Sequence, residues 1–128
     1  MRVLLDTHVL LWAVDNPSLL GPQATIALQD LGNELHISAA TIWELSIKVG
    51  LSKLQLSLAF RDWMNKAVGD LSATILPITV EYANIQASLP FHHRDPFDRL
   101  MIAQAIAEQI PIVSSDATMD SYSIQRIW

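Results

Sequence analysis

Short apolar runs alternate along this chain with longer stretches of helical periodicity, and this alternation constrains the fold more than any other feature. The runs expected to form strands are Val3–Leu5, Glu34–Ser38, Thr74–Ile78, Ile112–Val113 and Ile124–Trp128. This order is typical of βαβ units, in which helices cover both faces of a parallel sheet. We therefore predict an α/β fold, a three-layer α/β/α sandwich whose central sheet is mainly parallel.

Turn and capping residues delimit the helices between these strands. We predict helices over residues 8–14, 22–31, 39–49, 58–68, 80–89 and 96–110. Ser38 and Thr79 stand where an N-cap hydroxyl is expected, while Gly50 and the pair Gly69-Asp70 stand where a helix should stop. Pro77 indicates that its strand lies at an edge of the sheet or ends there, because proline cannot donate to a ladder.

The size and composition fit one globular domain over residues 1–128. With 51% of its residues apolar and 16% charged, the chain can bury a sizeable core, so disorder is not expected. No apolar run approaches the roughly 18 residues that span a bilayer. The absence of cysteine excludes disulfides and thiolate metal ligands, and we expect a cytoplasmic protein.

The formal net charge of −5 argues against a passive nucleic-acid binder, which usually carries an excess of Lys and Arg. It does not argue against a nuclease, because a cluster of carboxylates that holds divalent cations makes the metal-free protein acidic. A strongly acidic site would also attract a basic protein partner.

Two aspartates lie just after expected strands: Asp6 directly follows the first, and Asp116 follows Ile112–Val113 after two serines. Ligands of parallel sheets bind outside the carboxyl ends of the strands near a topological switch point, so both side chains are expected at one rim. Each has an alternative role as the N-cap of the segment that follows it. For Asp6 we favour a functional role, since a carboxylate at the end of a central strand is costly without a partner.

Three more acids lie at helices that should start at this rim. Glu44 is about one and a half turns into its helix and can still reach the rim; an exposed pair with Lys48 explains it equally well. Asp95 with Pro96 is an efficient helix start, so capping explains Asp95 adequately. Asp98 occupies the first turn, where an acid favours the helix dipole, just before the apolar stretch that packs on the sheet.

Carboxylates that converge in a cleft repel one another, which raises their pKa values and destabilises the fold. A hard divalent cation relieves the repulsion, because Mg²⁺ and Mn²⁺ prefer oxygen ligands. Such a cation also acidifies water and positions it for in-line attack on phosphorus. The converging acids therefore make chemical sense only with metal.

The histidines do not have the spacing of a zinc site, and we expect His92 and His93 to be exposed loop residues. Arg94 and Arg99 are candidate phosphate contacts, although Arg99 equally suits an ion pair with Asp95. The tryptophans with apolar neighbours are expected in the core or at an interface: Trp12, Trp43 and Trp63.

Four motifs together resemble those of PIN-domain proteins, specifically the VapC-type toxins of bacterial toxin–antitoxin pairs. They are LLDTHVLLW, SAATIWELSIKVG, HHRDPFDRLMIAQA and IVSSDATMDSY. Each motif alone is weak, but the four in this order and spacing are specific, and they cover essentially the whole chain. The resemblance implies an α/β/α sandwich, a Mg²⁺- or Mn²⁺-dependent endoribonuclease activity and inhibition by a cognate antitoxin.

The resemblance also implies roles for residues at the matching positions. It assigns the catalytic acids to Asp6, Glu44, Asp98 and Asp116, of which Asp6, Asp98 and Asp116 would bind metal. Glu44 would position or deprotonate the attacking water. Supporting residues would be Thr7 and Ser115, where relatives often have small hydroxyl residues, together with Asp95 and Arg99. Whether Asp95 contacts the metal is open.

Two other hypotheses compete with an RNA-cleaving toxin. A non-catalytic interaction module would use the same acidic groove to bind a basic partner protein. A phosphatase-like hydrolase would use Asp6 as a covalent nucleophile, but such enzymes usually carry a second Asp two residues later, where this chain has His8. For the toxin we expect an RNA substrate, a cognate antitoxin and a homodimer. The apolar helices around Trp12 and Trp63 would suit either a dimer interface or an antitoxin groove.

Overall fold

The computed structural model describes residues 1–128 and contains one five-stranded sheet. Its strands are β1 (Arg2–Leu5), β2 (Glu34–Ser38), β3 (Thr74–Leu76), β4 (Ile112–Val113) and β5 (Arg126–Ile127). They lie in the order β3-β2-β1-β4-β5, and every neighbouring pair is parallel. The predicted parallel sheet is confirmed, and Pro77 directly follows β3, which is an edge strand as expected.

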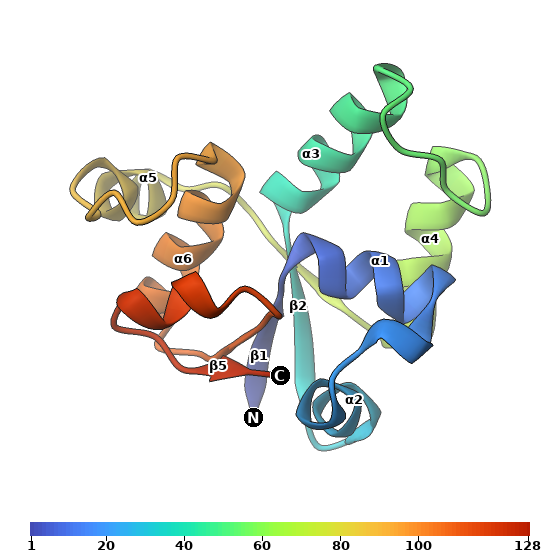
Figure 1. Cartoon of the computed structure of the whole chain (residues 1–128), viewed down its shortest axis with the longest axis horizontal. Coiled ribbons are helices and arrows are strands. Elements are labelled where there is room, and N and C mark those ends of the chain that lie inside the picture. Colours follow the sequence, from blue (N-terminus) through green and yellow to red (C-terminus); the bar gives the residue numbers. More distant parts are fainter.

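Helices flank the sheet on both faces, which confirms the three-layer sandwich (Figure 1). The α-helices are α1 (Thr7–Asp15), α2 (Pro22–Gln29), α3 (Ala39–Gly50), α4 (Phe60–Leu71), α5 (Val80–Ala87) and α6 (Pro96–Glu108), and the short 3₁₀ helices are η1 (Pro17–Leu19) and η2 (Ala117–Ser121). Helices α1, α2 and α4 lie on one side of β1 and β2, while α5 and α6 lie on the other (Figure 1). None of these helices has the length and apolar character needed to cross a membrane.

The alternation of side chains along the strands divides the core into two clusters. Val3 and Leu5 face one way and pack with residues of α1, α2 and α4, including the fully buried Trp63. Leu4 faces the opposite way and packs against α6 and η2. Trp63 is thus a core residue as predicted, whereas Trp43 on α3 is 59% exposed and does not belong to the core.

Helix α4 runs through the Gly69-Asp70 pair, so the predicted break there is wrong. The helix ends instead at Leu71, where Ser72 adopts a left-handed conformation with φ of 47°. An exposed glycine inside a helix costs only about 1 kcal/mol, and the apolar face anchored by Trp63 outweighs this cost.

The switch point of the sheet lies between β1 and β4, because the chain builds β2 on one side of β1 and β4 on the other. The backbone N–H of Asp6 donates to the carbonyl oxygen of Val113 at 3.0 Å, which ties the carboxyl ends of these two strands together. Two segments far apart in sequence therefore end at the same rim, where ligands of such folds bind.

Gly21, just before α2, has no space for a side chain. A Cβ there would lie 2.8 Å from Cε2 and 2.9 Å from the carbonyl carbon of Trp128. We predict that Gly21→Ala lowers the free energy of unfolding by about 1–3 kcal/mol, the usual cost of overpacking. Urea unfolding followed by circular dichroism measures this change.

Gly69→Ala is the matched control. A Cβ at Gly69 meets nothing within 4 Å, and the residue lies inside α4. Alanine there should stabilise the protein by about 0.5–1 kcal/mol through its helix propensity. Equal effects of the two substitutions would contradict the packing that we describe around Gly21.

Candidate metal centre

A cleft of about 370 Å³ opens at the carboxyl ends of β1 and β4. Carboxylates, hydroxyl groups and one lysine dominate its lining: Asp6, Thr7, His8, Trp12, Glu44, Lys48, Asp95, Asp98, Ser115 and Asp116. All four acids predicted from the sequence lie here, together with Asp95, Thr7 and Ser115. They come from four separate segments of the chain: the starts of α1, α6 and η2, and the middle of α3.

Asp6 is only 5% exposed and accepts two hydrogen bonds from the protein. The backbone N–H of Thr7 donates to Oδ1 at 2.7 Å, which makes Asp6 the N-cap of α1. The Ser114 hydroxyl donates to Oδ2 at 2.7 Å. Burial raises the pKa of Asp6 above its ordinary value, the Ser114 hydrogen bond opposes this effect, and the charge of Glu44 adds to it. The capping role and the cleft position therefore coexist in one residue.

Glu44 is 3% exposed, so the expectation of an exposed pair with Lys48 is wrong although the pair itself exists. Thr7 Oγ1 donates to Glu44 Oε1 at 2.7 Å, and Lys48 Nζ donates to Oε2 at 2.8 Å. The hydrogen bond to Glu44 raises the pKa of Lys48. Thus a buried carboxylate of the cleft has its charge balanced by the one lysine in the lining.

Asp98 differs from the other acids because its carboxylate accepts no hydrogen bond from the protein. Burial raises its pKa to about 7, with further contributions from the negative charges of Asp95, Asp6 and Glu44. Asp95 is the N-cap of α6, and its Oδ1 accepts the backbone N–H groups of Phe97 and Asp98, as the capping interpretation predicts. The cleft therefore holds a carboxylate that accepts no hydrogen bond from the protein, and other acids lie close to it.

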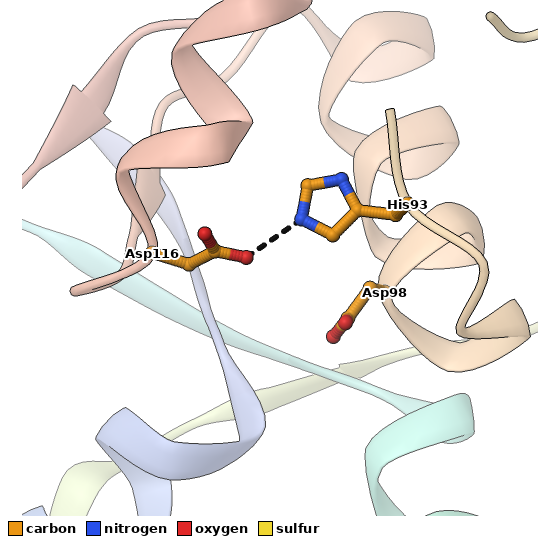
Figure 2. A group of neighbouring side chains, drawn as sticks. All are labelled: His93, Asp98 and Asp116. Atoms are coloured by element: carbon orange, nitrogen blue, oxygen red, sulfur yellow. Dashed lines mark hydrogen bonds and ion pairs between the residues drawn. The ribbon is translucent and has the colours of Figure 1, made fainter. Parts of the chain in front are cut away.

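Asp116 is the N-cap of η2, and its Oδ1 accepts the backbone N–H of Thr118 at 3.0 Å. Its Oδ2 lies 2.6 Å from Nε2 of His93. Burial would raise the pKa of Asp116, but the hydrogen bonds from His93 and Thr118 outweigh it and hold the pKa below its usual range. Figure 2 shows the His93 ring and the Asp116 carboxylate facing each other, with Asp98 close by. One donor atom of each of these three side chains lies within 4.8 Å of the others.

The exposed position predicted for His93 is wrong, because its side chain is only 8% exposed. His92, by contrast, is exposed as expected. No periodicity marks the loop before α6, so nothing in the local sequence distinguishes these adjacent histidines. Tyr122, which contacts the His93 ring and backbone, was the signal available, but it lies 29 residues further along the chain.

Arg99 is not in the cleft, and neither of its predicted roles is found. The residue is 5% exposed, its guanidinium stacks 4.0 Å above the Phe91 ring, and no ion pair joins it to Asp95. Its N–H groups donate to three main-chain carbonyl oxygens, those of Gln86, Leu89 and Pro90. Arg99 therefore fixes the segment that connects α5 to the loop of His93, and no phosphate can reach it.

The donor set of the cleft suits a hard divalent cation. Its acidic side chains offer oxygen ligands, which Mg²⁺ and Mn²⁺ prefer, and no cysteine is present. Asp98 in particular presents an ionisable carboxylate whose pKa is raised by burial and by the neighbouring acids, and a cation would relieve this repulsion. The residues at this rim therefore fit such an ion.

A family model described as the PIN domain matches residues 3–124. Ribonuclease VapC22 of Mycobacterium tuberculosis (strain ATCC 25618 / H37Rv) is 29% identical over 125 residues, which are 97% of this chain and 94% of that protein. A similar fold occurs in the crystal structure of VapBC2 from Rickettsia felis bound to a DNA fragment of its promoter (TM-score 0.72, 19% identity, covering 98% of this chain and 97% of that chain). A toxin–antitoxin complex from Klebsiella pneumoniae is also similar (TM-score 0.64, 18% identity, covering 98% of this chain and 96% of that chain).

We predict that Asp98 makes the metal-free protein less stable as the pH rises. Its folded-state pKa of about 7 exceeds the ordinary 3.8, so the stability it contributes at low pH is lost as the pH rises through 7. Allowing for partial exposure, the loss between pH 5 and pH 8 is about 1–2 kcal/mol. Urea unfolding in EDTA at both pH values measures it, and Asp98→Asn should remove it.

The exposed Asp70 lies outside the cleft, so Asp70→Asn should keep the pH dependence of the wild type. Adding Mg²⁺ or Mn²⁺ at pH 8 should restore the lost stability of the wild type, since binding to the folded state stabilises it. An Asp98→Asn protein with an unchanged pH dependence would show that the repulsion lies elsewhere.

Proposed function

The chain belongs to the PIN-domain family, and we propose that it is a metal-dependent endoribonuclease that acts as the toxin of a toxin–antitoxin pair. The observation that carries this proposal is the convergence of Asp6, Glu44, Asp98 and Asp116 in one cleft. The relative named as a ribonuclease, which is similar over nearly its whole length, supports RNA as the substrate.

We assign the metal ligands to Asp6, Asp98 and Asp116, and the ion to Mg²⁺ or Mn²⁺. When bound, such an ion supplies positive charge to the scissile phosphate and lowers the pKa of a water molecule that attacks it. Asp6 is held rigidly by its bonds to Thr7 and Ser114, so its direction is set before any ion binds. Asp98 contributes the carboxylate that has no competing protein donor.

Glu44 is the proposed proton acceptor. Its Oε1 is fixed by the Thr7 hydroxyl, which leaves Oε2 as the atom that accepts a proton from the attacking water. As the water oxygen bonds to phosphorus, the bond from phosphorus to one ribose oxygen breaks, and this oxygen takes a proton from a solvent water and leaves as a hydroxyl group. Lys48 occupies Oε2 in the free protein, so it must release Glu44 for this step. A phosphate oxygen of the RNA gives the Lys48 ammonium an alternative partner.

The proposed protein partner is a cognate antitoxin with a basic segment. The structural similarity to a toxin–antitoxin complex from Klebsiella pneumoniae supports this choice. An Arg of such a partner would pair with the carboxylates of the cleft. Trp63 itself is buried, and the surface predicted on the helices around Trp12 and Trp63 stays a prediction. A groove of about 510 Å³ between residues of α3, α4 and β3, lined in part by Ile42, Met64 and Ile75, offers an apolar surface to such a partner. The homodimer stays a prediction.

We predict that Asp6→Asn and Asp98→Asn each reduce metal-dependent RNA cleavage by about 100-fold or more, since each removes a charged metal ligand. The assay incubates the purified chain with a panel of single-stranded and hairpin RNAs, with Mn²⁺ or with EDTA. Asp70→Asn, outside the cleft, should cleave like the wild type.

Two outcomes would contradict the proposed function. Full activity of Asp6→Asn, or cleavage that persists in EDTA, would show that the acids and the metal are not needed for RNA cleavage. A wild-type protein that cleaves no RNA in the panel but binds a basic helical peptide in the cleft would instead support a non-catalytic interaction module.

A further inference from the structure

His93 contacts two residues of the η2 region, Asp116 at its start and Tyr122 after its end. Its Nε2 lies 2.6 Å from Asp116 Oδ2, and its Nδ1 lies 3.2 Å from the Tyr122 hydroxyl oxygen. The backbone N–H of His93 donates to the same hydroxyl oxygen at 3.0 Å. Both the ring and the backbone of His93 are therefore fixed by Tyr122.

Counting hydrogens assigns a direction to this chain of contacts. The Tyr122 oxygen accepts the backbone N–H of His93, and its own hydrogen is then free to be donated to Nδ1. A neutral imidazole that accepts at Nδ1 carries its hydrogen on Nε2. That hydrogen points at Asp116 Oδ2, so the order of donation is Tyr122 to His93 to Asp116.

The geometry distinguishes a positioning residue from a metal ligand. Two donor atoms at right angles, each about 2.1 Å from one ion, are separated by about 3.0 Å. The 2.6 Å between His93 Nε2 and Asp116 Oδ2 is shorter than this separation and corresponds to a short hydrogen bond to a charged acceptor. Asp116 lines the cleft and His93 does not. His93 therefore lies behind Asp116, as seen from the cleft.

Asp116 needs such support because it stands on a short helical segment with a side chain that is 36% exposed. Thr118 holds Oδ1 through one backbone N–H, and this single contact leaves the carboxylate free to tilt. The hydrogen bond from His93 to Oδ2 fixes the plane of the group. Arg99 in turn anchors the start of the loop that carries His93 through its bonds to main-chain carbonyls.

We propose that His93, oriented by Tyr122, is a positioning residue that fixes the direction of the Asp116 carboxylate in the cleft. The proposal rests on the proposed function, because it gives Asp116 its place in the same metal site. Partners of this kind behind metal-binding groups typically change metal affinity or activity by about 10–100-fold when they are removed.

The test compares three substitutions with a matched control. His93→Phe keeps a ring but removes both nitrogens, His93→Gln retains an N–H donor, and Tyr122→Phe removes only the hydroxyl. The control is His92→Phe, since His92 is the exposed neighbour and meets Tyr122 only through a ring edge. For each protein, calorimetry gives the Mn²⁺ affinity, RNA cleavage gives kcat and KM, and thermal melting checks the fold.

We expect His93→Phe to weaken Mn²⁺ binding and to lower kcat at a fixed Mn²⁺ concentration, each by about 10-fold or more, while KM for RNA stays close to that of the wild type. His93→Gln should recover most of the loss, Tyr122→Phe should lose several-fold, and His92→Phe should match the wild type. If His93 only packed the loop, the N–H donor of His93→Gln would not restore the metal affinity that His93→Phe loses.

Wild-type Mn²⁺ affinity and kcat in folded His93→Phe would overturn the proposal, and so would His93→Gln as impaired as His93→Phe. If His93→Phe does not fold, Tyr122→Phe decides in the same way. If the wild type binds Mn²⁺ but cleaves no RNA, the proposed function fails while the affinities still decide the role of His93. A wild type that binds no Mn²⁺ overturns both.

Discussion

The hydrogen bond from Ser114 to the buried carboxylate of Asp6 is the contact on which the rest of the site depends. It joins the ends of β1 and β4 across the switch point, beside the backbone bond from Asp6 to Val113. A buried carboxylate is costly, and here the Ser114 hydroxyl and the Thr7 N–H offset part of that cost. The offset is incomplete, because burial still raises the pKa of Asp6 above its ordinary value.

The acids of the cleft differ in the hydrogen bonds that their carboxylate oxygens accept from the protein. Asp6, Glu44 and Asp116 each accept hydrogen bonds at both carboxylate oxygens, so their directions are set by the fold. Asp98 accepts none and carries the raised pKa. Preorganised ligands keep a site in a fixed geometry, while an unpaired carboxylate gives an incoming cation the largest electrostatic gain. This difference in hydrogen bonding explains why burial and the neighbouring acids raise the pKa of Asp98 to about 7.

Topology explains what the sequence predicted well. Acids that follow parallel strands meet at one rim, so Asp6 and Asp116 could be placed together without coordinates, and the caps at Ser38 and Thr79 follow from local chemistry. The failures all come from tertiary contacts. The burial of His93 depends on the distant Tyr122, and Arg99 is buried because main-chain carbonyls surround it. The sequence did not single out Ser114 from its neighbour Ser115. Which of the two hydroxyl groups faces Asp6 depends on the direction of the chain at the end of β4.

The position of β1 at the centre of the sheet has a consequence for the order of events during synthesis. Asp6 and Ser114 are 108 residues apart, so their contact has a high sequence separation and forms only after a large loop has closed. A nascent chain that ends before residue 112 lacks both β4 and Asp116, one of the four acids. A chain of that length on the ribosome therefore has no assembled cleft, and the complete set of acids exists only after Asp116 has been synthesised.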